Sequence, residues 1–332
     1  MKNPVSYARF AVALAALATV AACSGTRNVR VPEVTASIAA AAATPGAPSP
    51  ADPSALPPVP AGNLVKVSLV LLDRTLEIAP GLRYQTWTFN GTVPGPVIHA
   101  KVGQTIDVTL TNESQMGHSI DFHSALAPPD VAYQTIAPGS TIHFSWVARY
   151  PGAFLYHCGT PPVLMHISNG MYGAVIVDPE DGWPDGDAES FVLLQSEFYT
   201  MPVPGQPGVY QGNYNKARAS MPDVVDFNGN AMQYVRSPLP IDVGKPVRVF
   251  VVNAGPSHFS AFHVIGTIFD TVYVAGNPSN ALHGLQTIPI APGDGAIGEF
   301  TVQQAGRYPF VTHSFGDADL GAMGAFRTRQ GT

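Results

Sequence analysis

The stretch GQTIDVTLTN at positions 103–112 has a counterpart in the second half of the chain, GKPVRVFVVN at positions 244–253. In both stretches apolar side chains recur at every second position, which is typical of a half-buried β-strand. Two histidines, five positions apart, follow each stretch: His118 and His123 in the first half, His258 and His263 in the second. The chain therefore contains an internal repeat that begins with a strand.

The repeat continues toward the end of each half. GAFLYHC at 152–158 corresponds to GRYPFVTHS at 306–314, and MYGA at 171–174 corresponds to AMGA at 322–325. On this alignment His313 takes the place of His157, and the second half has lost the cysteine and the methionine of the first. The pattern predicts an all-β chain of two related β-sandwich domains, at about 63–180 and 181–330, of which only the first can hold a thiolate metal site.

The composition agrees with this fold and restricts the partners. Of the 332 residues 45% are apolar and 12% are charged, and Gly and Pro number 32 each. Short apolar runs separated by turn residues favour strands over long helices. The net charge of −6 argues against a nucleic-acid partner, which needs a basic patch. A small anionic substrate remains compatible, because a local site can be positive on an acidic protein.

The N-terminus has the pattern of an export signal. Lys2 and Arg9 precede an apolar run at 10–22 that is too short to span a bilayer in the mature protein. The run ends in VAACS at 20–24, which resembles a bacterial lipoprotein signal that makes Cys23 the acylated first residue. Ordinary signal cleavage nearby, with Cys23 incidental, is the alternative. Residues 24–62 are rich in Ala and Pro and are expected to form a flexible tether. We therefore expect an exported, periplasmic or cell-envelope protein with a lipid anchor in the membrane.

The pleat of the strands predicts a blue copper site in the first domain. Cys158 is the one cysteine left after Cys23, and a lone thiol in an exported protein calls for a function. Alternation puts His118 and Cys158 on one side of the strands. His166 and Met171 follow Cys158 at eight and thirteen positions. Two imidazoles, a thiolate and a weak thioether are the ligands of a type 1 (blue) copper centre.

The other side of the same strands predicts a second metal. Asp121, His123 and His157 share that side by the same alternation. Two imidazoles are few for a catalytic site, which usually has three protein ligands and an open position. The repeat suggests His313 as the missing ligand, since it corresponds to His157.

From about residue 85 to the C-terminus the chain resembles the copper-containing nitrite reductases. The matching stretches are TFNGTVPGP at 88–96, HSIDFH at 118–123, YHC at 156–158, His166 with Met171, FHVIG at 262–266, and His313 with LGA at 320–322. The resemblance implies two tandem cupredoxin-like Greek-key β-sandwich domains. It also implies His118, Cys158, His166 and Met171 as type 1 ligands, and His123, His157 and His313 as type 2 ligands. In that family the third type 2 histidine comes from the neighbouring subunit of a homotrimer.

The resemblance further implies the reaction. Nitrite is reduced by one electron to nitric oxide and water, with one type 1 and one type 2 copper per subunit and no other cofactor. The donor would be a small cupredoxin or a cytochrome c type protein, with the electron passing along the Cys158–His157 backbone. Asp121 and His263 match the catalytic proton donors, and Ile265 matches an apolar residue of the substrate pocket. The loop at 159–165 departs from the best-known members and is one residue shorter, which would affect the potential or the choice of donor.

Two alternative functions can be compared with this one. A laccase-type oxidase needs eight histidines, mostly in His-X-His pairs, whereas this chain has ten histidines and no such pair. A cupredoxin-like electron carrier or copper-binding protein without catalysis would explain the Cys158 site. It would leave Asp121, His123, His263 and His313 without a role. The remaining histidines are interpreted as structural: His99, His143, His258 and His283.

Overall fold

A computed structural model describes residues 52–329 of the chain. The expected signal peptide at 1–23, the lipidation site Cys23 and the tether as far as residue 51 lie outside these residues. No helix within 52–329 is long and apolar enough to cross a membrane.

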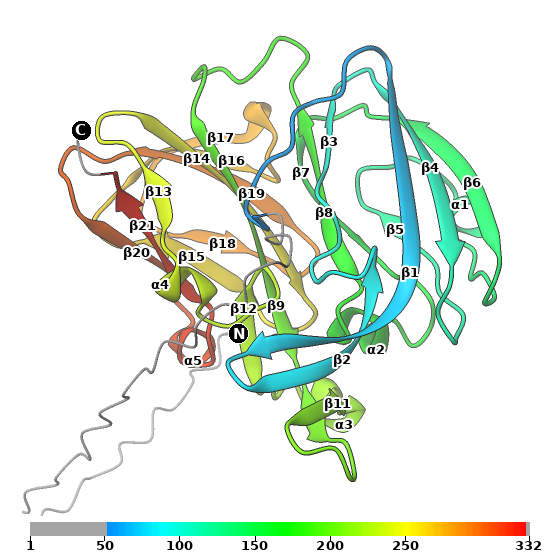
Figure 1. Ribbon diagram of the computed structural model, residues 1–332. Coiled ribbons are helices and arrows are strands. Elements are labelled where there is room, and N and C mark those ends of the chain that lie inside the picture. The colour runs from blue at the N-terminus through cyan, green and yellow to red at the C-terminus, as the bar shows by residue number, and fades with distance from the viewer. Residues whose placement is uncertain (1–51, 330–332) are drawn as a thin grey trace, which may run out of the picture. The chain divides into compact units, whose positions relative to one another are not determined.

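The first half of the described chain forms a β-sandwich, coloured blue to green in Figure 1. One sheet has the strand order β10-β11-β2-β1-β4-β6 and the facing sheet has the order β3-β8-β7-β5. The bounds are β1 (Leu64–Ala79), β2 (Leu82–Phe89), β3 (Ile98–Lys101), β4 (Thr105–Asn112), β5 (Asp121–Phe122), β6 (Thr141–Val147), β7 (Gly152–His157), β8 (Tyr172–Asp178), β10 (Thr200–Pro202) and β11 (Val209–Gly212), with α1 (Pro129–Ala132) and α2 (Val163–Ser168) in the connections. Ile106, Val108 and Leu110 of β4 are buried, which confirms the alternation in the first repeat.

The second half forms another sandwich, with the strand orders β12-β9-β14-β19-β16-β17 and β13-β21-β20-β15-β18. Its strands are β9 (Glu189–Phe198), β12 (Val224–Phe227), β13 (Leu239–Ile241), β14 (Pro246–Gly255), β15 (Ser260–Val264), β16 (Phe269–Val274), β17 (Ala281–Leu285), β18 (Ile288–Ile290), β19 (Gly295–Thr301), β20 (Arg307–Thr312) and β21 (Met323–Thr328). Its helices are α3 (Tyr214–Arg218), α4 (Gln233–Arg236), the 3-10 helix η1 (Pro278–Asn280) and α5 (Phe315–Asp319). The parallel pair β9·β14 repeats the parallel pair β1·β4 of the first sandwich. The all-β fold of two related sandwiches is thus as the repeat predicted.

An apolar layer joins the two sandwiches. Each sandwich has its own core, and a third cluster lies between β7 and β8 on one side and β9, β14 and β19 on the other. Leu155, Tyr172 and Ile176 contribute from the first sandwich, and Leu194 and Phe250 from the second. Strand β8 is consequently buried on both faces, and it lies in the middle of Figure 1. Strand β7, which leads into Cys158, pairs with β8 along its length and is itself largely buried.

Part of the expected tether packs against the fold. Gln104 Nε2 donates hydrogen bonds to the backbone oxygens of Pro60 (2.9 Å) and Gly62 (2.6 Å). Ala55 pairs with Phe191 of the second sandwich in an isolated bridge. The packed structure therefore begins before the expected boundary at residue 62. The sequence did not show this because residues 55–62 are held largely through backbone groups, which leave no apolar periodicity to detect.

The hairpin β10–β11 also crosses the expected domain boundary. It belongs by sequence to the second domain, yet Val209 and Tyr210 pair in parallel with Arg83 and Tyr84 of β2. The first sandwich therefore includes a hairpin contributed by the second half of the chain.

Candidate metal centres

His118, Cys158 and His166 meet in the interior of the first sandwich. The two Nδ1 atoms of His118 and His166 are 3.0 Å apart, and Cys158 Sγ lies 3.2 Å from His166 Nδ1 and 3.9 Å from His118 Nδ1. All three side chains are buried, as is Met171. One thiol and two imidazole nitrogens thus converge within 4.8 Å of one another.

Backbone hydrogen bonds hold the four residues in this arrangement. Cys158 N–H donates to Met171 O (3.1 Å), and Met171 N–H donates to His166 O (3.2 Å). Since β7 ends at His157 and α2 carries His166, the turn from α2 into β8 returns Met171 to the level of Cys158. Ser119 N–H donates to Cys158 Sγ at 3.3 Å.

The donor set fits copper. Burial lowers the pKa of His118 to about 4, and burial together with His118 lowers the pKa of His166 to about 4, so both rings are neutral near pH 7. Two neutral imidazole nitrogens and a thiol sulfur that converge on one point are the donor types that bind a soft cation such as copper. Trp87 packs against both rings at centroid distances of 5.5 Å and 4.9 Å. Sequence reasoning missed Trp87, although it directly precedes the 88–96 motif.

A second group lies on the opposite side of the same strands. The Nε2 atoms of His123 and His157 are 3.1 Å apart, and an Asp121 carboxylate oxygen is 3.9 Å from His157 Nε2. Asp121 is paired with His157 across β5 and β7, which explains their proximity. His123 is exposed and His157 is nearly buried, so this group opens to the surface.

Backbone carbonyls fix the tautomers of these two histidines. His123 Nδ1 donates to Gly293 O (2.8 Å), and His157 Nδ1 donates to Cys158 O (3.0 Å). A neutral ring that donates through Nδ1 has its free lone pair on Nε2, and the two Nε2 atoms point at each other. Burial is the main cause that lowers the pKa of His157, and it favours the neutral ring. Gly293 belongs to the turn before β19 of the second sandwich, and nothing in the sequence near His123 indicated that partner.

His263 and His313 lie together elsewhere, on the second sandwich. Their ring centroids are 5.4 Å apart, and His263 Nδ1 donates to Gln286 O. His313 is exposed, and Ile265 beside them is 43% exposed. Within residues 52–329 His313 does not join the group of Asp121, His123 and His157, whose candidate ligand atoms all lie within 4.8 Å of one another.

The ladders correct one step of the repeat alignment. Tyr156 pairs with Gly173 and Phe310 pairs with Gly324, and in both pairs the aromatic ring fills the space that a glycine Cβ would occupy. Counting forward from these pairs, Val311 corresponds to His157 and Thr312 to Cys158. His313 therefore lies two positions beyond the counterpart of His157. The sequence alignment missed this shift because it equated two segments that differ in length by two residues.

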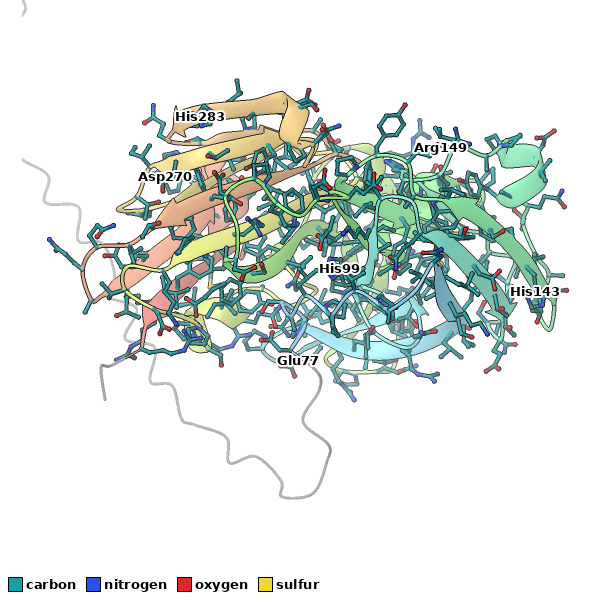
Figure 2. The ribbon with its side chains drawn as sticks, turned by 90° about the horizontal axis from the view of Figure 1, so that it is seen from above. Glu77, His99, His143, Arg149, Asp270 and His283 are labelled. Atoms are coloured by element: carbon teal, nitrogen blue, oxygen red, sulfur yellow. The ribbon has the colours of Figure 1, made fainter. Side chains whose placement is uncertain are left out.

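Other histidines lie apart from both groups. His99 Nδ1 donates to Pro57 O at 2.5 Å, His143 contacts Thr109, and His283 Nδ1 donates to Asp270 O at 3.2 Å. Figure 2 shows His143 and His283 at opposite sides of the protein, with His99 between them. These contacts agree with structural roles.

Comparisons with known proteins agree on one family. A family model described as multicopper oxidase matches residues 73–182. A copper-containing nitrite reductase of Neisseria gonorrhoeae is 39% identical over 268 residues, which cover 79% of this chain and 68% of the relative. A solved copper nitrite reductase from Nitrosomonas europaea superposes with a TM-score of 0.74 at 35% identity, covering 80% of this chain and 94% of that structure. A solved copper-containing nitrite reductase from Thermus scotoductus has the same TM-score at 29% identity, covering 80% of this chain and 62% of that structure.

Proposed function

Because this chain belongs to the copper-containing nitrite reductases, it reduces nitrite to nitric oxide, and we propose that two neighbouring subunits together form its catalytic copper site. Family membership also decides between the enzyme and the electron carrier in favour of the enzyme. The type 1 copper site of this chain consists of His118, Cys158, His166 and Met171.

The type 2 copper in this proposal is held by His123 and His157 of one subunit and by His313 of a neighbour. The observation that carries the proposal is the separation of two incomplete half-sites. Asp121, His123 and His157 form the first, on one sandwich, while His263 and His313 form the second, on the other. Each half-site is open to the surface and has two imidazoles, one fewer than the three type 2 histidines that the family resemblance implies. A head-to-tail arrangement that pairs the two halves closes into a ring, and the family resemblance makes this ring a homotrimer.

His118, Cys158, His166 and Met171 would hold the type 1 copper, which would supply one-electron transfer from a donor protein. His123, His157 and His313 of a neighbour would hold the type 2 copper, which would supply a Lewis acid and the electron for nitrite. His157 and Cys158 are adjacent residues that belong to the two sites, so their shared peptide is the shortest covalent route between them. The hydrogen bond from His157 Nδ1 to Cys158 O, which belongs to the following peptide, ties the imidazole to the backbone of Cys158. The residues on this route are held rigidly by the buried strands around β7.

Protons come from Asp121 and His263 in this scheme. The Asp121 side chain is 38% exposed and lies 3.9 Å from His157 Nε2, so its carboxyl can take a proton from water and deliver it beside the ligands. His263 Nδ1 donates to Gln286 O, which leaves Nε2 as the ring atom for proton transfer in this scheme. Ile265, exposed next to His263, supplies an apolar wall for the pocket.

The remaining assignments rest on the sequence pattern. We propose export to the periplasm or cell envelope, with Cys23 as the lipidated residue of a membrane anchor. The donor is proposed to be a small cupredoxin or a cytochrome c type protein. Nitrite is the substrate by family membership.

Mixed oligomers test the shared site. His123→Ala disables the first half-site and His313→Ala disables the second, so neither variant alone should reduce nitrite. In a ring of randomly mixed subunits, about one quarter of the interfaces combine two intact halves. Co-expression of both variants should therefore restore nitrite reduction to roughly a quarter of the wild-type rate, counted over all subunits of the mixed rings. If all ligands came from one chain, the mixture would remain inactive, and that result would refute the proposal.

A further inference from the structure

The second sandwich contains a structural counterpart of the type 1 site. Cys158 N–H donates to Met171 O and Thr312 N–H donates to Ala322 O, both at 3.1 Å. Met171 N–H donates to His166 O (3.2 Å), and Ala322 N–H donates to Asp317 O (3.1 Å) in the same way. Asp317 therefore corresponds to His166, Thr312 to Cys158 and Ala322 to Met171.

His118 pairs with Ile136 and Ser260 pairs with Ile290, so Ser260 is the counterpart of His118. His258 lies two residues before this position and reaches Asp317 from there. The amide of Asn112 donates to backbone oxygens at Met116 and Ile136 around the His118 loop, and the amide of Asn253 donates to those of His258 and Ile290. His258 Nδ1 lies 2.8 Å from Asp317 Oδ1. In the second sandwich the counterpart of His166 is thus an aspartate that pairs with a nearby histidine.

The contacts of His258 require a charged ring. Nδ1 faces the Asp317 carboxylate and Nε2 faces Ser220 O at 3.1 Å, and both partners can only accept hydrogen bonds. A second buried carboxylate, Glu197, accepts the backbone N–H groups of Ser257 (3.0 Å) and His258 (2.7 Å). Burial disfavours the charge, but the hydrogen bond to Asp317 and the charges of Glu197 and Asp317 outweigh it and raise the pKa of His258. The result is an ion pair whose acidic member, Asp317, is only 3% exposed.

This ion pair joins the two segments that carry the second half-site. His258 lies two residues before β15, which carries His263. Asp317 lies in α5, where the exposed ring of Phe315 packs edge-on against the His313 ring at 4.7 Å. His313 N–H donates to Ala261 O of β15 at 2.7 Å. The orientation of α5 relative to β15 therefore determines how His313 and His263 are presented.

We propose that His258 and Asp317 are positioning residues for the type 2 copper site, and that their ion pair is the link that orients His313 and His263. This inference rests on the proposed role of His313 as a ligand. Neither residue of the pair touches the metal or the substrate in this scheme. Their effect passes through α5 and β15.

The test uses the full-length, copper-loaded protein with Asp317→Asn, which preserves shape and removes the charge. We expect about 10- to 100-fold weaker type 2 copper binding, the range for residues that orient metal ligands. The type 2 electron paramagnetic resonance signal should change and the KM for nitrite should rise, while the blue absorption is retained. Asp319→Asn is the matched control, because Asp319 is exposed on the same helix. His258→Asn should reproduce the effect, and the double variant should lose less than the sum of the two single losses.

The outcomes separate this inference from the proposal on which it rests. If Asp317→Asn and His258→Asn lower only the unfolding temperature and leave type 2 affinity and spectrum unchanged, the pair is merely structural and the inference is wrong. If His313→Ala retains type 2 copper, the assignment of His313 itself fails. Loss of type 2 copper in His313→Ala together with normal binding in Asp317→Asn would reject the positioning role alone. Should either single variant fail to fold, the other decides by the same spectrum.

Discussion

Replacement of Cys158 by serine should remove the blue centre and leave the type 2 site loaded. The thiolate is the donor of the intense charge-transfer band, and a serine hydroxyl cannot replace it. His123 and His157 lie on the other side of the strands, and their Nδ1 contacts are to the backbone oxygens of Gly293 and Cys158. Those backbone atoms are unchanged by the substitution, so the type 2 half-site should persist.

The stability of the copper-free variant can be worked out from the contacts of Cys158. Its sulfur accepts Ser119 N–H at 3.3 Å and lies 3.2 Å from His166 Nδ1, and a serine hydroxyl keeps both partners within reach. We therefore expect Cys158→Ser to lower the free energy of unfolding by about 1 kcal/mol. Cys158→Ala leaves the buried Ser119 N–H without a partner and should cost about 1–3 kcal/mol. Copper at 100 times its dissociation constant should stabilise the wild-type type 1 site by about 2.7 kcal/mol, a gain that both variants lose.

The assay combines absorption, electron paramagnetic resonance and denaturant unfolding, each with and without copper. Wild-type protein carrying only type 2 copper is the reference for the loaded variants. Loss of both coppers from Cys158→Ser would show that the two sites are not separable. A copper-free serine variant that is less stable than the alanine variant would refute the hydrogen-bond reasoning.

Asp121→Asn and His263→Ala should each lower nitrite turnover by about 10²- to 10⁴-fold with both coppers retained, as expected for general acid groups; turnover within about twofold of wild type would remove that residue from the mechanism. The fully buried Asp226 offers a test by pH, since burial raises its pKa to about 7 against the opposing hydrogen bonds from Ser196 and Gly229. A carboxyl whose pKa is higher in the folded than in the unfolded state stabilises the fold most at low pH. Relative to Asp226→Asn, the wild type should lose stability on the order of 4 kcal/mol between about pH 4 and pH 7. Parallel unfolding free energies for the two proteins over this range would contradict the assignment.

Strand alternation was enough to sort the candidate ligands into two sets. His118 and Cys158 lie on one side, and Asp121, His123 and His157 lie on the other, as the pleat requires. This part of the reasoning succeeds because side-chain direction along a strand is a local property. The loop that returns His166 and Met171 is short, so those two residues could also be placed from spacing.

Reasoning from the repeat was weaker where the two halves differ in length. It assigned His313 to the position of His157, whereas the ladders put Val311 there. Several placements of a gap can give equally good sequence alignments, whereas the hydrogen bonds between strands fix a single register. His258 was interpreted as structural, and its pairing was missed because its partner Asp317 lies 59 positions away in the sequence.

The sequence by itself determined the chemistry of the protein: an all-β repeat, a thiolate and imidazoles suited to copper, and the family to which they belong. These features depend on residue identity and on short spacings, which the pleat converts directly into faces. Only the tertiary structure decided which backbone atoms orient the ligands, such as Gly293 O at His123, 170 positions away. Only the tertiary structure separated His263 and His313 from His123 and His157 within one chain. The physical reason is that contacts between distant segments depend on how two sandwiches pack, and no local pattern encodes that packing.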